Sequence, residues 1–369
     1  MYVESQKQQF SKILANVADS LDIPESRYKE AVSRYEIIGK WLDANDSKLH
    51  IYKPTIYPQG SFRLGTMTKP ISDGDEYDID LVCHLEINKD NITQAQLKEM
   101  VGARLKENET YRKMLEEGRR CWTLDYANEF HMDILPAIPD YARLNDCILI
   151  TDKKLKLWQK SNPKGYARWF VERMRAIFEK RKMVLAESMR ANVEDVPDWK
   201  VRTPLQRSVQ LLKRHRDIYF NGKDDKPVSI IITTLAGQSY QNEADLFDAL
   251  FSIIDGMTDS KNIKNQYVKY YIPNPTNPEE NFADKWNEDE SLPKAFLAWL
   301  VQLKADMETA IEQRDLSELK EALGPIFGVG LVGTAIDKLK PVSAKSKTYT
   351  NVKMSTPEKP NPDKPWSFR

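Results

Sequence analysis

The chain has 369 residues, 41% of them hydrophobic and 30% charged, which is enough to bury one large core or two moderate ones. Its 55 Lys and Arg residues balance 55 Asp and Glu residues, which excludes a polybasic protein drawn to nucleic acid by net charge. No apolar stretch reaches the roughly 20 residues that span a bilayer, and the N-terminus lacks the charged and then apolar pattern of a signal peptide. We therefore expect a globular, cytoplasmic protein that does not bind membranes.

The first 160 residues predict a mixture of helices and strands. Two helices are expected within the first 47 residues, since Phe10, Ile13, Leu14 and Val17 form a stripe at helical spacing. A further helix is expected at 93–107, among five extended segments. These segments are residues 51–58, 78–87, 119–125, 129–135 and 147–151. Because strands and helices mix without regular alternation, the predicted fold class is α+β.

From about residue 164 the pattern becomes helical. The expected helices are at 164–190, 203–220, 228–240, 243–256 and 289–313, with a Pro- and Asn-rich connection at 272–281. We therefore predict a sheet lobe with the N-terminal helices at 1–160, a helical lobe at 161–340 and an extended tail at 341–369. The tail is rich in Pro, Lys and Ser and too poor in aliphatic residues to fold alone.

Residues 151–190 form a basic segment, with twelve Lys and Arg against four acidic residues. Such an excess is most often a solvated helix face. It also fits a surface that binds polyphosphate or nucleic acid. The sequence leaves both interpretations open.

The cysteines and histidines do not indicate a metal site. The three cysteines are Cys83, Cys121 and Cys147, and the four histidines are His50, His84, His131 and His215. The cysteines are odd in number and lack a CxxC pair, so we expect free thiols packed as small hydrophobic side chains. The histidines are not spaced as metal ligands, and we expect His84 to be structural.

The most informative segment is QGSFRLGT at 59–66. A strand that ends at Gly60 and Ser61 and turns into a helix leaves backbone N–H groups free to bind an anion. Glycine lets a phosphate approach the backbone closely, and the Ser61 hydroxyl adds another donor. Glycine-serine turns are common, so this motif alone is a weak signal.

Asp78 and Asp80, in YDIDLV at 77–82, strengthen that signal. Side chains two positions apart on a strand project from one face, so the two carboxylates repel each other unless a cation neutralises them. Carboxylate oxygens suit a hard divalent cation, and we predict Mg²⁺, with Mn²⁺ as a substitute. Two solvent-facing acids on an edge strand are the alternative, which the preceding glycine-serine turn disfavours.

A two-metal phosphoryl-transfer site usually needs a third carboxylate. The candidates are Asp125, Asp133 and Asp140. In FHMDIL at 130–135, Asp133 is an acid in an otherwise apolar strand, which is costly unless the acid is paired or bound to metal. Asp125 lies near an expected hairpin turn and Asp140 in a loop. We therefore predict that Asp133 is the third acid.

Together these motifs resemble the DNA polymerase β-like nucleotidyltransferase superfamily. Within it, QGSFRLGT, EYDIDLV and FHMDILPA are similar to segments of the bacterial cyclic-oligonucleotide synthases called CD-NTases, relatives of animal cyclic GMP-AMP synthase and oligoadenylate synthase. The likeness continues through SNPKGYARWF, TPLQRSVQLLKRHRD and NPTNPEENFADKW and covers about residues 50–310. It implies a two-lobed polymerase β-like fold, in which a mixed-sheet catalytic lobe packs against a helical lobe and nucleotides lie between them.

The resemblance also implies residue roles. Lys213 matches a lysine that holds the nucleotide triphosphate, and Ser229 matches a position that contacts the donor nucleotide. A solvated surface lysine and an ordinary N-cap serine are the alternatives. The acids Asp78, Asp80 and Asp133 are then both catalytic and metal-binding.

The implied activity joins nucleoside triphosphates, ATP among them, into a cyclic di- or trinucleotide second messenger for anti-phage defence, with release of pyrophosphate. It requires no primer nucleic acid, and it leaves room for protein partners from a defence operon. An RNA-directed transferase of the tRNA-nucleotide or poly(A) type, or a protein-AMPylating enzyme, shares the same acids and is the alternative. Outside enzymes, the alternative is an inactive nucleotide-sensing scaffold.

Overall fold

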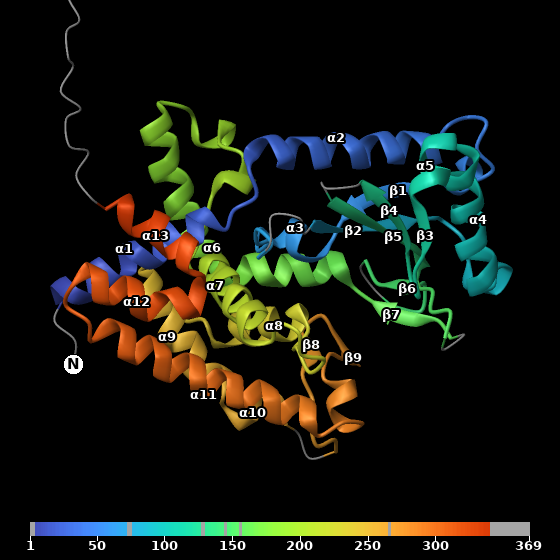
Figure 1. Cartoon of the computed structure of the whole chain (residues 1–369). Coiled ribbons are helices and arrows are strands. Elements are labelled where there is room, and N and C mark those ends of the chain that lie inside the picture. The colour runs from blue at the N-terminus through green and yellow to red at the C-terminus, as the bar shows by residue number, and fades with distance from the viewer. Residues whose placement is uncertain are drawn as a thin grey trace, which may run out of the picture.

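The computed structural model describes residues 4–71, 76–126, 130–143, 146–154, 157–264 and 267–339. The predicted tail at 341–369 lies outside the described residues. A sheet occupies one side of the molecule and a bundle of helices the other, and α6 runs between them (Figure 1). The two-lobed α+β fold predicted from the sequence is therefore confirmed.

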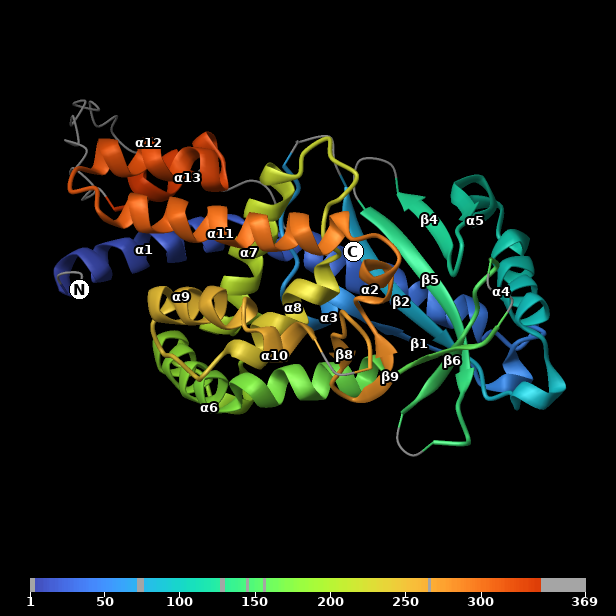
Figure 2. The ribbon, with the colours of Figure 1, turned by 90° about the horizontal axis from the view of Figure 1, so that it is seen from below.

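The sheet lobe is built on a mixed sheet in the order β1-β2-β5-β4-β3, with β6 paired to β5 and β7 to β6. The strands are β1 (Thr55–Pro58), β2 (Tyr77–His84), β3 (Leu115–Glu117), β4 (Trp122–Tyr126), β5 (Phe130–Pro139), β6 (Ile148–Ile150) and β7 (Gln159–Ser161). The central strands β2 and β5 run parallel, and every other pair in this sheet is antiparallel. Two strands that are far apart in the sequence, β2 and β5, thus lie side by side in the sheet (Figure 2).

One face of this sheet is covered by helices. They are α2 (Glu25–Leu42), α4 (Gln94–Glu107) and α5 (Glu109–Met114), and α2 lies along the strands in Figure 1. Alternate residues such as Ile79, Leu81 and Met132 share a buried core with side chains of α2 and α4. The short helix α3 (Gly60–Leu64) follows β1 and contacts β2.

The helical lobe forms a second, larger core. Its helices are α1 (Glu4–Ser20), α6 (Pro163–Met189), α7 (Pro204–Tyr219), α8 (Ser229–Ser239), α9 (Leu246–Met257), α10 (Ser260–Ile263), α11 (Ser291–Ile311), α12 (Leu316–Phe327) and α13 (Val329–Asp337). A hairpin of β8 (Pro273–Asn274) and β9 (Asn277–Asn281) lies between α10 and α11 in the chain. In the described part of the chain, we find no helix that is both long and apolar enough to cross a membrane.

The N-terminal helix α1 packs into the helical lobe. Phe10, Ile13, Leu14 and Val17 are buried in the helical core rather than beneath the sheet, and α1 contacts α13 and α9. The stripe predicted from the sequence is real, but its partners come from the other end of the chain. The domain bounds at 160 and 340 stay a prediction, to which this packing adds that α1 contributes to the helical core.

Three differences from the predicted elements have local causes. The strand predicted at 51–58 is wrong in its first half, since a 3-10 turn at His50–Tyr52 and a left-handed Lys53 precede it. The connection at 272–281 contains the β8–β9 hairpin. Helices α12 and α13 were not predicted, because Pro325 inside α12 and Gly328 between the two helices are helix-breaking signals.

Candidate active site

The three predicted acids lie on one face of the sheet. In the parallel pairing of β2 with β5, Asp80 is directly opposite Asp133, and Asp78 is opposite His131. Strand alternation places these side chains on the face away from Ile79 and α2. Neighbouring strands are about 4.8 Å apart, so three carboxylates from two strands share a small area.

Their charges oppose one another. The pKa of Asp80 is raised to about 6 by burial and by the charges of Asp133 and Asp78. Burial and the charge of Asp133 also raise the pKa of Asp78, which is the more exposed of the two. Oxygen-only ligands with crowded negative charge fit a divalent cation such as Mg²⁺, because a bound cation removes the repulsion that raises both pKa values.

Gly60 lies directly against Asp80. Its φ of 58° is in the left-handed region, and a Cβ atom at this position would lie 2.3 Å from Asp80 Oδ2. The neighbouring Gln59 N–H donates to the Asp80 carbonyl oxygen at 2.8 Å. Only glycine therefore allows the turn between β1 and α3 to approach the second acid so closely.

Ser61 follows at the same turn. Its side chain is half-buried, and among the described residues its hydroxyl makes no hydrogen bond. Its carbonyl oxygen accepts the Thr66 N–H at 3.0 Å, which fixes the turn after α3. The hydroxyl is thus available to a ligand, and its contact with a phosphate stays a prediction.

Lys213 reaches the site from the helical lobe. Helix α7 begins at a capping box formed by Thr203 and Gln206. Lys213 lies further along the same helix, and only 6% of its surface is exposed. Its Nζ donates to the Thr66 carbonyl oxygen at 3.1 Å. Its charge lowers the pKa of both Asp78 and Asp80, so the two lobes meet here.

Burial, helped by the charge of Arg216, lowers the pKa of Lys213 to about 8. A lysine in this position costs stability unless an anion neutralises it. The alternative interpretation, a solvated surface lysine, is wrong for this residue because the side chain is buried.

Ser229 lies further round the helical lobe. It is the first residue of α8, and Val228 occupies the N-cap position, so the N-cap alternative is wrong. The Ser229 hydroxyl accepts a hydrogen bond from Arg216 Nη1 at 2.7 Å, which ties α8 to α7. Its contact with a nucleotide stays a prediction.

The two rejected candidates for the third acid have other surroundings. Asp140 follows β5, is 5% exposed, and lies 3.7 Å from Arg143. Asp125 lies on β4 opposite His131. Neither lies directly opposite Asp80, whereas Asp133 does.

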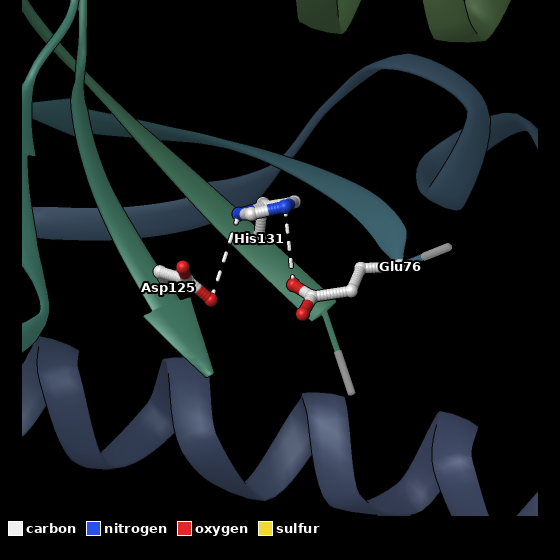
Figure 3. A group of neighbouring side chains, drawn as sticks. All are labelled: Glu76, Asp125 and His131. Carbon is white, nitrogen blue, oxygen red and sulfur yellow. Dashed lines mark ion pairs between the residues drawn. The ribbon is translucent and has the colours of Figure 1, made fainter. Parts of the chain in front are cut away.

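Sequence analysis missed a group of three side chains beside the acids. Glu76, Asp125 and His131 have potential metal-ligand atoms within 4.8 Å of one another. His131 Nε2 lies 3.1 Å from Glu76 and Nδ1 lies 3.9 Å from Asp125 (Figure 3). The two carboxylates therefore face opposite nitrogens of one imidazole ring. Because its members come from three separate segments, spacing in the sequence could not reveal it.

A large cavity is bordered by α3. Its volume is about 1000 Å³, its lining includes Tyr28, Phe62, Trp169 and Trp199, and none of the three acids lines it. Residues of α2, α3 and α6 contribute most of its lining. Size alone therefore does not locate the chemistry in this molecule.

Comparisons with known proteins identify the family. Residues 5–173 match the Second Messenger Oligonucleotide or Dinucleotide Synthetase domain family. A c-di-GMP synthase from Roseivirga ehrenbergii is 33% identical over 324 residues, which is 87% of this chain and 85% of the relative. The chain belongs to the CD-NTase family. This CD-NTase is therefore a nucleotidyltransferase of the cyclic-oligonucleotide synthase kind.

Further similarities agree with that assignment. Cyclic dinucleotide synthase CdnG of Bradyrhizobium diazoefficiens is 27% identical over 354 residues, covering 88% of this CD-NTase and 82% of the relative. The structure of CdnG in complex with GTP superposes with a TM-score of 0.73 at 23% identity over 90% of this chain and all of that one. The CdnC structure from Escherichia coli, determined with ATP, gives 0.64 at 14% identity, covering 86% and 96% of the two chains. At these identities the two structures establish the fold.

Proposed function

We propose that this CD-NTase makes a cyclic dinucleotide from GTP by two successive nucleotidyl transfers at the acid face of the sheet. The single observation that carries the proposal is the register of β2 and β5, which sets Asp133 opposite Asp80 while Gly60 lies against Asp80. Three carboxylates and a phosphate-binding turn thus converge on one place. That combination fits metal-assisted transfer to a nucleotide hydroxyl.

The residues of the sheet lobe have different roles in this proposal. Asp78 and Asp80 would hold divalent cations, Mg²⁺ or in its place Mn²⁺, and Asp133 would share one of them while facing the attacking ribose hydroxyl. Bound there, the cations supply charge neutralisation at the transferred phosphate and lower the pKa of the attacking hydroxyl. The turn at Gly60 and the Ser61 hydroxyl bind phosphate oxygens of the donor.

Lys213 and Ser229 complete the donor site from the helical lobe. The Lys213 ammonium group lies beside the acids, and its low pKa of about 8 returns upward when a triphosphate binds, because the anion stabilises the charged form. Ser229 is held by Arg216 at the start of α8, from which it would contact the same nucleotide. Contacts of the nucleotide with both lobes would then favour a closed arrangement of the two lobes over the substrate.

The reaction balances in two transfers. A ribose hydroxyl of one GTP attacks the α-phosphorus of another, a new P–O bond forms, and pyrophosphate leaves with the broken anhydride bond. The linear product then turns in the site, so that its free hydroxyl attacks its own remaining α-phosphorus and a second pyrophosphate leaves. Each hydroxyl proton passes to a carboxylate or water near Asp133.

The choice of GTP and of a two-nucleotide ring rests on the relatives. The two similar curated proteins are named for cyclic dinucleotide synthesis, one of them for c-di-GMP, and CdnG has been determined with GTP. We extend the proposal to a second messenger of anti-phage defence, which fits the family. We expect the synthesis to need no primer, and we expect protein partners from a defence operon to regulate it.

The test is incubation with each nucleoside triphosphate alone and with all four together, with Mg²⁺ or Mn²⁺, followed by phosphatase treatment and mass spectrometry. We expect a phosphatase-resistant product of two guanylates and no extension of added tRNA. A phosphatase-sensitive linear product would replace cyclisation by oligomer synthesis. Incorporation into tRNA or protein would favour the RNA-directed or AMPylating alternative, and an absence of turnover would favour the inactive scaffold.

A further inference from the structure

Thr123, on the strand next to the third acid, contacts Asp133 directly. The two residues lie opposite each other in the antiparallel pairing of β4 with β5. Thr123 Oγ1 donates a hydrogen bond to Asp133 Oδ1 at 2.6 Å. This distance is typical of an O–H group that donates to a carboxylate, and such charge-assisted bonds are stronger than neutral ones.

The sequence of β4 explains why a hydroxyl is at this point. In WTLDY at 122–126, Trp122, Leu124 and Tyr126 are buried, whereas Thr123 and Asp125 are partly exposed. Alternation therefore places Thr123 on the acid face, while its neighbours hold β4 to the core. Motifs for catalytic acids give no reason to single out a threonine, so sequence analysis did not.

The strand that carries Thr123 is rigidly held. Trp122 Nε1 donates to the Lys98 carbonyl oxygen at 2.8 Å, and the Trp122 ring fills the space over Gly102, where a Cβ would lie 2.2 Å from the ring. On either side β4 pairs with β3 and β5. Because the backbone of β4 is held on both sides, the Thr123 hydroxyl has a defined position and can restrict the orientation of a side chain that it hydrogen-bonds.

Among the residues that the structure describes, no Lys, Arg or His forms an ion pair with the Asp133 carboxylate. The Thr123 hydroxyl holds its Oδ1 by a hydrogen bond. The final torsion of an aspartate side chain is broad and roughly two-fold. One anchored oxygen removes that freedom and leaves the second oxygen, Oδ2, for another ligand.

Cys121 lies beside the same contact, and its thiol interacts with both Thr123 and Asp133. Its Sγ lies 3.9 Å from Thr123 Oγ1. Burial, together with the charge of Asp133, raises the pKa of the Cys121 thiol to about 11, so at neutral pH it adds no negative charge beside Asp133. Since the Thr123 hydroxyl hydrogen points to Asp133, the thiol can donate to the Thr123 oxygen.

We propose that Thr123 is a positioning residue, which holds Oδ1 of Asp133 so that Oδ2 stays available to the catalytic cation and the attacking hydroxyl. This inference rests on the proposed function, because it assumes that Asp133 binds a cation. Thr123 itself touches neither the nucleotide nor the cation. Its effect is on the orientation of the acid.

The test compares Thr123→Val, which keeps shape and loses the hydroxyl, with Thr123→Ser, which keeps the hydroxyl. Thr151→Val is the matched control, since the buried Thr151 hydroxyl donates to the Arg120 carbonyl oxygen at 3.0 Å in the same lobe. We measure kcat, KM for GTP and the Mg²⁺ concentration for half-activation. Mn²⁺ binding is measured separately by electron paramagnetic resonance, without turnover.

For Thr123→Val we expect kcat to fall about tenfold and the half-activating Mg²⁺ concentration and the Mn²⁺ Kd to rise about threefold or more, with KM for GTP within about twofold of wild type. Thr123→Ser and Thr151→Val should stay within about twofold on every measure. Wild-type kcat and Mn²⁺ Kd in Thr123→Val would overturn the inference, as would an equal loss in Thr123→Ser, which would indicate packing instead.

The two proposals fail in different ways. If the wild-type chain converts GTP and Asp133→Asn does not, but Thr123→Val behaves as wild type, the positioning role alone is wrong. If the wild-type chain forms no product while Thr123→Val still binds Mn²⁺ more weakly, the proposed function is wrong and the positioning role stands. A wild-type chain that binds no Mn²⁺ overturns both.

Discussion

The two faces of the central sheet differ although the same strands form them. On β2, Ile79 and Leu81 are fully buried in the core shared with α2 and α4, whereas Asp78 and Asp80 point to the opposite face. There, burial and mutual charge raise the carboxylate pKa values. Neighbouring residues of one strand thus have opposite effects: the apolar side chains stabilise the fold, and the acids between them destabilise it.

The difference is the one that the proposed function requires, with one face of the sheet serving the fold and the other the chemistry. Beyond the acids, the same face becomes apolar again at Val82, Leu135 and Ala137, so the unfavourable charges are confined to a short stretch. Active sites commonly hold groups that destabilise the folded state, with stability supplied elsewhere. Variants on the two faces should therefore affect different measurements.

The largest expected effect is on the acid face. Asp78→Asn together with Asp80→Asn should abolish nucleotide incorporation, while the metal-free Tm at neutral pH stays the same or rises because repulsion is removed. Leu81→Ala, on the other face, should instead lower the free energy of unfolding by about 2–5 kcal/mol. Turnover in the double variant would refute the metal assignment.

The effect of Asp80 on the metal-free stability depends on pH, and the direction of this dependence follows from its raised pKa. Asp80 has a folded pKa of about 6, above its unfolded value, so the folded state binds a proton that the unfolded state releases between about pH 4 and 6. Its cost to metal-free stability is therefore fully present above pH 6 and fades toward pH 4. The gain in Tm for Asp80→Asn, measured by scanning calorimetry without metal, should fade over the same interval.

The next effect concerns the turn that lies against Asp80. Gly60→Ala should lower kcat by about a hundredfold, because a Cβ 2.3 Å from Asp80 Oδ2 displaces the acid from its productive position. Gly222→Ala is the matched control: its φ of 74° is also left-handed, but nothing lies within 4 Å of the added Cβ. The control should lose about 1 kcal/mol of stability and keep its kinetics. Equal kinetics in both variants would mean that the turn does not shape the site.

A smaller effect is expected at Lys213. Lys213→Met should raise KM for the nucleotide by roughly tenfold to a hundredfold, with a smaller fall in kcat, because a charge-assisted contact contributes roughly 1.5–3 kcal/mol. Since its pKa is about 8, the wild-type KM should rise as the pH passes above that value. The exposed Lys223→Met serves as the control. An unchanged KM in Lys213→Met would mean that the lysine does not bind substrate.

Much of the fold follows from periodicity in the sequence. The helix predicted at 93–107 is observed as α4 at Gln94–Glu107, because a capping box at Thr93 and a regular apolar stripe both operate within one segment. The same reasoning missed α13, because Pro325 and Gly328 interrupt the local helical signal and α13 is held by packing on both α12 and α1. A contact between the two ends of the described chain leaves no local signal.

The candidate site divides in the same way. Asp78, Asp80 and Gly60 are recognisable because their chemistry requires a fixed spacing within one short segment. The contact of Thr123 with Asp133 and the bridge from Glu76 through His131 to Asp125 depend on strand register, which sequence spacing does not determine. Lys213 was found through family resemblance. Its burial and its hydrogen bond to the Thr66 carbonyl oxygen depend on tertiary packing, which the sequence pattern does not reveal.

The smallest effect is expected in the basic segment at 151–190. Several of its charges are paired, for example Arg168 with Asp146 at 2.6 Å and Arg175 with Glu172, and both arginines are largely exposed. Exposed pairs contribute roughly 0–1 kcal/mol, so Arg175→Gln should leave stability and product formation almost unchanged. Arg173→Gln is the contrast, since Arg173 donates to the carbonyl oxygens of Gly237 and Tyr240, and its loss leaves these acceptors unsatisfied.

Variants in the same segment also distinguish a primer-independent synthase from an RNA-directed transferase. An enzyme that holds an RNA 3′ end needs exposed cations along the path to its acids, and their removal weakens RNA binding with a reduced salt dependence. We expect Arg168→Glu with Arg175→Glu to form the cyclic product from free nucleotides at a rate within about twofold of wild type, since both arginines are largely exposed and exposed charges are screened over about 10 Å at 0.1 M salt. Loss of turnover that high salt reproduces in the wild-type chain would instead assign this surface to a nucleic-acid substrate.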